Sequence, residues 1–128
     1  MTSAAEILIV DDEQIVGERL RDYFEKKGMS VETFTVSREA IDRLKEKTFD
    51  VIVTDIKMEG PTGMDILLEV KKEAPSSEVI LITGYGSFET LRAAEAVGAY
   101  DYICKPFKVE DVYKKVAKAA AKARKRAR

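Results

Sequence analysis

The sequence predicts a single α/β domain in which five βα units form a doubly wound parallel sheet. Short apolar runs alternate with segments of helical periodicity along the whole chain, and most of the runs end in a polar cluster. Continuous apolar runs of this length are typical of strands buried on both faces, and repeated strand–helix units favour a parallel sheet with right-handed crossovers. No linker divides the 128 residues, a length that suits one domain.

Each expected strand is a short apolar run, and each helix is marked by its spacing and its ends. The strands are expected at residues 7–10, 31–34, 50–54, 79–82 and near 101–104. The first helix is expected to stop at Gly28 and the third at Pro75, because glycine and proline commonly end helices. Ser37 and Ser87 are expected to cap the second and fourth helices with their hydroxyl oxygens. The last helix is expected to begin near Val109.

Composition excludes several classes of protein. The chain is 45% hydrophobic and 35% charged, which is ordinary for a globular domain, and it has no apolar stretch near the ~18 residues that span a membrane. The absence of histidine excludes Ser-His and Cys-His catalysis and histidine-based metal sites. The single cysteine, Cys104, predicts no disulfide framework and favours a reducing cytoplasm. Because Cys104 lies in an apolar run, we expect a buried small hydrophobe and not a nucleophile.

The charge is distributed unevenly along the chain. Residues 114–128 carry eight Lys or Arg and no acid, which leaves 14 bases against 23 acids, a net −9, in residues 1–113. Beyond Val116 the apolar positions are all alanine, which favours helix but buries little area. We therefore expect residues 117–128 to be a basic helical tail that projects into solvent, or the start of a linker into an output domain. Direct nucleic-acid binding is disfavoured because no recognition fold accompanies the tail.

Four polar clusters follow strands of the expected sheet. They are Asp11-Asp12, Asp55, Thr83-Gly84 and Lys105-Pro106. Ligands of open parallel sheets bind outside the carboxyl ends of the strands, and the flavodoxin-like strand order 2-1-3-4-5 places the first and third strands side by side. Three carboxylates would then lie together and repel one another unless a cation neutralises them. With oxygen ligands and no histidine, Mg²⁺ is the expected ion.

The same positions allow phosphoryl chemistry. An Asp pair after a strand more often just caps a helix, but Asp55 and Lys105 at equivalent strand ends weaken that interpretation. A carboxylate can act as a nucleophile and form an aspartyl-phosphate, and Asp55 is favoured because the loop after it is rich in glycine. Mg²⁺, Lys105 and the Thr83 hydroxyl would stabilise the charge that develops on the phosphoryl oxygens.

The sequence resembles the receiver domain of two-component response regulators over essentially its whole length. The matching segments are Val10-Asp11-Asp12-Glu13, Val53-Thr54-Asp55-Ile56-Lys57-Met58, Ile82-Thr83-Gly84 and Tyr102-Ile103-Cys104-Lys105-Pro106-Phe107. Each segment is weak alone, but their order and spacing are specific. The segments around Thr83 and Gly98 look most like receivers that are joined to ATP-dependent transcription activators.

The resemblance implies a role for each site residue. Asp55 would be the phosphoacceptor, and Asp12 and Asp55 would bind Mg²⁺ with their side chains. The backbone carbonyl of Lys57 would complete the protein's ligands, and Asp11 would act through water. Thr83 and Lys105 would contact the phosphoryl group.

The resemblance also implies a switch. The Lys105–Pro106 bond is expected to be cis. On phosphorylation Thr83 would move towards the phosphate and Tyr102 would turn inward. The surface of the fourth helix, fifth strand and fifth helix would then change its partners. Those partners would be a sensor histidine kinase, an output domain beyond this chain, and a second copy in a homodimer formed on phosphorylation.

The loop after Asp55 departs from the pattern of the family. Met58 and Gly63 hold their places, but Glu59 stands where the family usually has proline, and Pro61 comes two positions later. We therefore expect the backbone of this loop to differ while the chemistry stays the same.

Two other functions remain open from the sequence. The first is a Mg²⁺-dependent phosphatase with an aspartyl nucleophile, which would turn over a generic phosphomonoester; no later acidic pair resembles the metal motif of that class. The second is an interaction module that no longer takes phosphate, although all five site positions are intact. The favoured interpretation is a phosphoacceptor that assists its own phosphorylation and dephosphorylation and is not a turnover enzyme.

Overall fold

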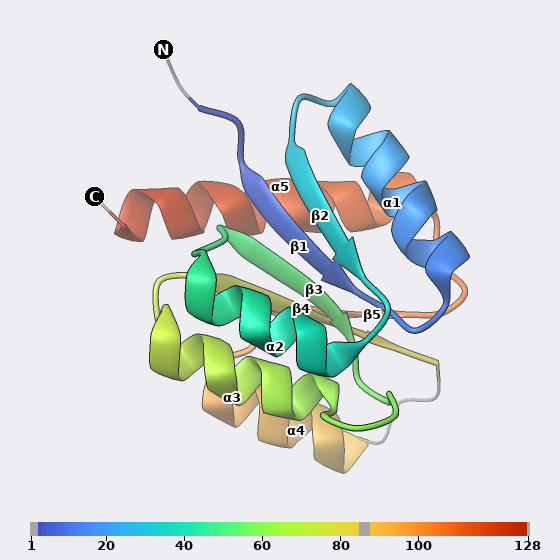
Figure 1. Cartoon of the computed structure of the whole chain (residues 1–128), viewed down its shortest axis with the longest axis vertical. Helices are drawn as coiled ribbons and strands as arrows, with labels where there is room; N and C mark the ends of the chain where they lie inside the picture. Colours follow the sequence, from blue (N-terminus) through green and yellow to red (C-terminus); the bar gives the residue numbers. More distant parts are fainter. Residues whose placement is uncertain (1–2, 85–87, 128) are drawn as a thin grey trace.

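The computed structural model describes residues 3–84 and 88–127, which form alternating strands and helices (Figure 1). The elements are β1 (Glu6–Val10), α1 (Gln14–Lys26), β2 (Ser30–Phe34), α2 (Ser37–Glu46), β3 (Val51–Asp55), α3 (Gly63–Glu73), β4 (Glu78–Thr83), α4 (Phe88–Val97), β5 (Asp101–Cys104) and α5 (Val109–Arg126). Across the described ranges, no helix is both long and apolar enough to cross a membrane.

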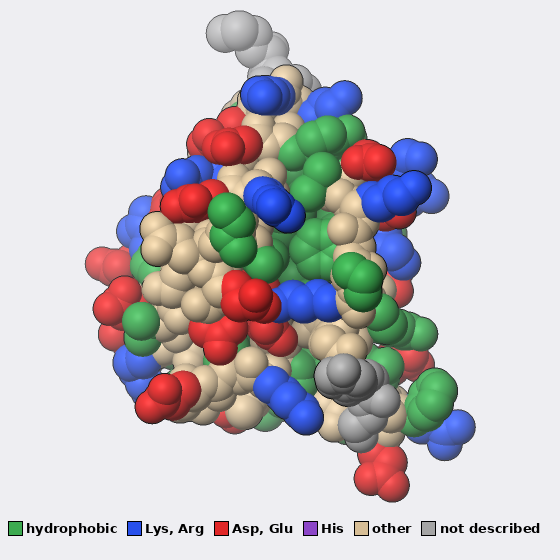
Figure 2. Space-filling model, turned by 90° about the vertical axis from the view of Figure 1, so that its right-hand side faces the viewer, with side chains coloured by type: hydrophobic (Ala, Val, Ile, Leu, Met, Phe, Trp, Pro, Cys, Tyr) green, Lys and Arg blue, Asp and Glu red, His purple; other side chains and the backbone are tan. Residues whose placement is uncertain are grey.

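The strands form one parallel sheet in the order β2-β1-β3-β4-β5, which confirms the predicted topology. β1 and β3 are neighbours, with Val10 opposite Thr54, so the residues that follow them emerge side by side. All five strands run in the same direction, so their carboxyl ends lie along one side of the sheet. Figure 2 views the molecule from this side.

Two apolar layers cover the two faces of the sheet. Alternate strand residues, such as Ile7 and Ile9, pack with Leu20 and Phe24 of α1 and with Val112 of α5. The intervening residues pack on the other face against α2, α3 and α4. β1, β3 and β4 are buried on both faces, which explains why they have continuous apolar sequences and not alternating ones.

The helix ends agree only in part with the sequence-based expectations. Gly28 follows α1 with φ = +90°, a backbone conformation that glycine adopts without strain. The expectation that Ser37 caps α2 was wrong: Val36 occupies the cap position, and Ser37 is the first helical residue. The Ser37 hydroxyl instead donates a hydrogen bond of 3.3 Å to the carbonyl oxygen of Glu59, because the loop after β3 lies beside it. Ser87 lies outside the described residues.

The end of α5 packs against the domain and does not project into solvent as expected. Ala119, Ala120 and Ala123 are at most 4% exposed. Their small side chains allow the helix to approach the sheet closely, so close packing and not side-chain size accounts for the contact. Their burial extends the α5 side of the core by two turns beyond Val116.

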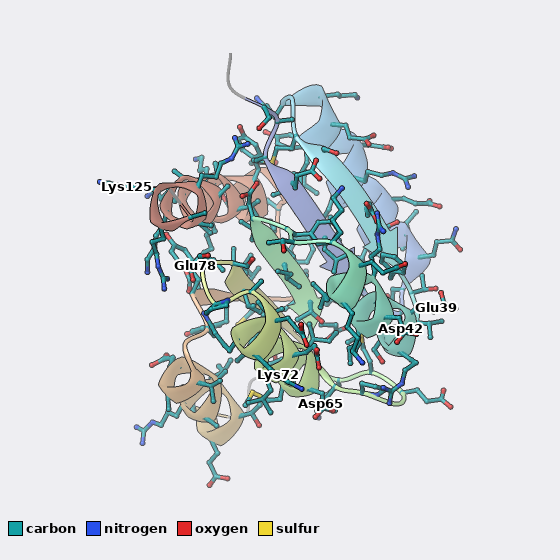
Figure 3. The ribbon with its side chains drawn as sticks, turned by 60° about the vertical axis from the view of Figure 1, so that its left-hand side comes forward. Glu39, Asp42, Asp65, Lys72, Glu78 and Lys125 are labelled. Atoms are coloured by element: carbon teal, nitrogen blue, oxygen red, sulfur yellow. The ribbon has the colours of Figure 1, made fainter. Side chains whose placement is uncertain are left out.

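Ion pairs fasten the same two turns of α5. Glu78, which Figure 3 labels, is 2% exposed at the start of β4. Its carboxylate lies 3.2 Å from Lys122 Nζ and 3.4 Å from Arg126 Nη1. Arg124 lies 3.5 Å from Asp50 Oδ2 and donates a hydrogen bond of 2.7 Å to the Ser3 hydroxyl. Lys115 also pairs with Asp101, so four of the seven Lys and Arg residues described between positions 114 and 127 form ion pairs within the domain.

Cys104 is exposed, which corrects the expectation that it is buried. Side chains alternate along β5, an edge strand, and only Ile103 turns into the core. The neighbours of Ile103 therefore point away from that layer. The apolar run was too short to reveal which of its residues face inward.

We expect Ala120→Asp to lower the free energy of unfolding by at least about 2 kcal/mol, because it places a charge in the contact between α5 and the sheet. Ala121→Asp is the matched control, since Ala121 is exposed one residue further along the same helix. It should change stability by less than about 0.5 kcal/mol. Urea unfolding followed by circular dichroism measures both. Equal effects would mean that the end of α5 does not pack on the domain.

Candidate functional site

The carboxyl ends of four strands bring the polar clusters together. Asp11 follows β1, Asp55 ends β3, Thr83 ends β4 and Lys105 follows β5. The Lys105 amide donates a hydrogen bond of 2.8 Å to the carbonyl oxygen of Thr83, which fixes the start of the β5–α5 loop on the site. Acidic side chains gather beside basic ones near the centre of this face (Figure 2).

Three carboxylates form the acidic part of the site. Asp11, Asp12 and Asp55 each place an oxygen within 4.8 Å of the others. Asp11 and Asp55 are only 1% and 8% exposed, whereas Asp12 is exposed. Asp11 Oδ1 accepts a hydrogen bond of 2.9 Å from the Glu13 amide, but Oδ2 is buried and has no hydrogen-bond partner among the described residues.

Lys105 is the cation of this group. Its Nζ donates hydrogen bonds to Glu13 Oε1 at 2.8 Å and to Asp55 Oδ2 at 3.2 Å. Asp11 Oδ2 lies 3.1 Å from the same atom, within ion-pair distance but without the angles of a hydrogen bond. One ammonium therefore serves three carboxylates. The peptide bond between Lys105 and Pro106 is cis, as the resemblance implied.

Glu13 is the residue of the site that the sequence analysis missed. It lies next to the aspartate pair, yet its carboxylate makes the shortest contact of Lys105. The Glu13 side chain is 60% exposed, and the other two acids that contact Lys105 are buried. The sequence shows an acid directly after the aspartate pair, which could have suggested a role in the site. Only the fold shows that this acid faces a lysine 92 residues further along the chain.

The electrostatics follow from burial and from this shared ammonium. Burial raises the pKa of Asp11, and the Glu13 amide and Lys105 offset the effect only in part. The hydrogen bond from Lys105 lowers the pKa of Glu13. Burial alone would lower the pKa of Lys105, but Glu13, Asp11 and Asp55 raise it above its ordinary value. Lys105 is therefore fully charged at neutral pH.

A hollow of about 240 Å³ opens over Asp55. Lys57, Thr83 and Lys105 line it together with Asp55, so the hydroxyl and the ammonium flank one space. Tyr102 lies elsewhere: it is 38% exposed on β5 and borders a separate hollow between α4 and β5. The site residues are thus gathered around Asp55, with Tyr102 on the neighbouring surface.

The loop between β3 and α3, residues 56–62, is held in its middle and at its end. In its middle, the Ser37 hydroxyl donates a hydrogen bond to the Glu59 carbonyl oxygen. At its end, Thr62 and Asp65 form a reciprocal capping box that begins α3. Gly63 then approaches the strand end so closely that a Cβ there would lie 2.4 Å from the carbonyl oxygen of Asp55. The loop has a defined geometry with Glu59 in the position where the family usually has proline.

The acidic cluster has the oxygen ligands that a hard divalent cation needs. Three carboxylates lie within reach of one another, and the buried Asp11 Oδ2 lacks a hydrogen-bond donor. Mg²⁺ takes oxygen ligands and typically binds through one or two carboxylates while it keeps several waters. The residues present therefore fit Mg²⁺.

We expect Gly63→Ala to lower stability by about 2 kcal/mol or more, because the added methyl group collides with the backbone of Asp55. Gly84→Ala is the control, since a Cβ at Gly84 meets nothing within 4 Å. Thermal unfolding of the two variants measures the difference. A tolerated Gly63→Ala would show that α3 moves away from β3 at little cost.

In buffer without divalent metal, we expect Asp11→Asn to raise the midpoint of thermal unfolding at pH 7. The pKa of Asp11 is raised in the folded state, so at pH values above the ordinary Asp pKa of 3.8 the folded protein binds more protons than the unfolded chain. The stability of the wild type therefore falls as the pH rises from about 3.8 through the raised pKa. The gain from Asn should therefore be full at pH 7 and should fade towards pH 3. Asp42→Asn, an exposed change on α2, should have little effect at either pH. A destabilised Asp11→Asn at pH 7 would contradict the expected effect of burial.

The comparisons with known proteins agree with this geometry. The model of the response regulator receiver domain matches residues 7–117. The DNA-binding transcriptional regulator NtrC of Klebsiella pneumoniae is 33% identical over 111 residues, which cover 87% of this chain and 24% of that protein. The chain spans about a quarter to a half of the length of the curated relatives it matches.

Solved structures show the same likeness. The crystal structure of a response regulator receiver domain protein from Clostridium thermocellum has a TM-score of 0.87 and 34% identity, covering 94% of this chain and 97% of that one. The solution structure of the beryllofluoride-activated NtrC4 receiver domain dimer has a TM-score of 0.85 and 36% identity, covering 92% and 98%. With its topology, its strand-end residues and these matches, the chain belongs to the response regulator receiver domain family.

Proposed function

We propose that the domain is a phosphorylation-dependent switch in which Asp55 accepts a phosphoryl group. The observation that carries the proposal is the arrangement around Asp55: its carboxylate borders a hollow of about 240 Å³, with Lys105 Nζ at 3.2 Å and Thr83 on the same wall. A planar phosphoryl group in transfer needs charge stabilisation on its oxygens, and an ammonium and a hydroxyl around one hollow can supply it.

The transfer is a displacement at phosphorus. One oxygen of Asp55 forms a bond to phosphorus as the bond to the donor breaks. A phosphohistidine donor leaves as neutral imidazole, its ring taking up one proton from solvent as the bond to phosphorus breaks; an acyl phosphate donor leaves as a carboxylate. Lys105 already contacts the Asp55 carboxylate and stays close to the oxygens that gain charge.

Mg²⁺ would be held by the side chains of Asp12 and Asp55 and by the Lys57 carbonyl, with Asp11 acting through water. When bound, it supplies positive charge against the carboxylates and the phosphoryl oxygens. The cluster of carboxylates supports this assignment, as does Asp11 Oδ2, which is buried and accepts no hydrogen bond from the described residues.

The signal would leave through the surface of α4, β5 and α5. Tyr102 is 38% exposed and borders a hollow of about 270 Å³ between α4 and β5, which offers space for an inward rotamer. Movement of Thr83 towards the phosphoryl group would couple the site to this space, since both residues stand on adjacent strands. The response would be a shift between two states of one surface.

The partners follow from this role. We propose a sensor histidine kinase as donor, an output domain joined beyond residue 128 through the basic end of α5, and a homodimer on phosphorylation. The related NtrC4 receiver domain, solved as a beryllofluoride-activated dimer, supports the last of these. The domain would act in the cytoplasm as a phosphoacceptor and not as a turnover enzyme.

We expect incubation with acetyl phosphate and Mg²⁺ to add one phosphoryl group that is stable in acid and labile in base. Asp55→Asn should abolish the addition, and Asp42→Asn should leave it unchanged because Asp42 lies on the exposed surface of α2. Intact-protein mass spectrometry with and without Mg²⁺ measures the gain. The proposal fails if the wild type gains no phosphate or if Asp55→Asn gains as much.

A further inference from the structure

Lys105 has more acidic partners than a phosphorylated site leaves room for. Its ammonium donates hydrogen bonds to Glu13 and Asp55 and lies 3.1 Å from Asp11 Oδ2, so three carboxylates share one positive charge. Phosphorylation at Asp55 would bring further oxygens to the same ammonium, and charge-assisted bonds to phosphoryl oxygens are strong. The phosphoryl oxygens would then compete with the carboxylates for this ammonium, and the carboxylate that is easiest to release would be displaced.

Burial decides which contact is surrendered. Asp11 is 1% exposed, so loss of its cation would leave a buried carboxylate without compensation. The Glu13 side chain is 60% exposed and returns to water at little cost. Its backbone amide, which binds Asp11 Oδ1, takes no part in the exchange. Glu13 is the partner that can leave.

The contact between Glu13 and Lys105 also separates two hollows. One is the hollow over Asp55, and the other, of about 610 Å³, is lined by residues of α1 and of the β5–α5 loop, including Val16 and Phe107. Glu13, Gly84 and Lys105 are common to both linings. The Glu13–Lys105 pair thus forms part of the wall between the hollow over Asp55 and the neighbouring one.

We propose that Glu13 is a positioning residue that holds Lys105 in the unphosphorylated site and releases it to the phosphoryl oxygens. This inference rests on the proposed function. Glu13 competes with the phosphoryl group for one cation, so it lowers the affinity of the site for phosphate and favours the unphosphorylated state. Removal of its charge frees Lys105 for the phosphoryl group.

The test compares Glu13→Gln, which keeps the shape and loses the charge, with Glu25→Gln, an exposed change further along α1. The probe is beryllofluoride, a phosphoryl analogue, titrated at saturating Mg²⁺ and followed by NMR of the backbone amides. We expect Glu13→Gln to bind it about two- to fivefold more tightly than wild type, in keeping with the strength of an exposed ion pair. Glu25→Gln should match wild type. Equal affinity in all three proteins, or weaker binding by Glu13→Gln, would overturn the proposal.

A second measurement reads the contact without metal or phosphate. In lysine-labelled protein, the Cε resonance of Lys105 should shift on Glu13→Gln and not on Glu25→Gln. An unmoved resonance would refute the role of Glu13 while leaving the proposed function intact. Failure of wild type and both variants to bind beryllofluoride would instead overturn the proposed function, and the release of Lys105 with it, even where the resonance shifts.

Discussion

The arrangement of the site depends on one ammonium group placed against buried carboxylates at the edge of the sheet. Asp11 and Asp55 are nearly inaccessible to water, and two such charges together are unfavourable without a counter-ion. Lys105 provides that counter-ion from the end of β5, which is two strands away from β3 and three from β1. Its position is set by the backbone hydrogen bond to Thr83, so the end of β4 and the charge balance of the acids are linked.

The parallel topology makes this placement possible. Every strand delivers its last residue to the same edge, and the strand order puts the two acidic ends next to each other. The loop after β3 must then turn back sharply over Asp55. Gly63 permits the close approach, and the Thr62–Asp65 capping box begins α3 at once. Asp55 thereby has the backbone of Gly63 against it and also borders the hollow.

Much of this was predictable from the sequence, and the exceptions share a cause. The strands and the grouping of Asp11, Asp12 and Asp55 follow from apolar runs and from a general property of parallel sheets. The wrong expectations concerned residues whose surroundings come from elsewhere in the chain. Ser37 binds the Glu59 carbonyl, and Cys104 faces outward on an edge strand. Periodicity reports which face of an element is apolar, but it does not report what lies opposite.

Glu13 and the end of α5 also have surroundings that the sequence pattern does not reveal. Glu13 reads as one more acid beside an aspartate pair, and its partner becomes evident only when β5 is placed beside β4. The alanines after Val116 read as a weakly packed tail, because the area that a residue buries was judged from its size. Close approach of the helix to the sheet makes small side chains sufficient.

The ion pairs of α5 weaken the electrostatic field that the basic end of the chain produces at a distance. The basic stretch looks like an exposed positive patch, yet Lys122 and Arg126 face Glu78, and Arg124 faces Asp50. Opposite charges a few ångströms apart act as dipoles, whose field falls off faster with distance than that of a net charge. Counter-ions shorten the range further, to about 8 Å at physiological salt. The ion pairs therefore weaken the long-range field of the basic helix without cancelling it, because Lys122 and Arg126 share the single carboxylate of Glu78.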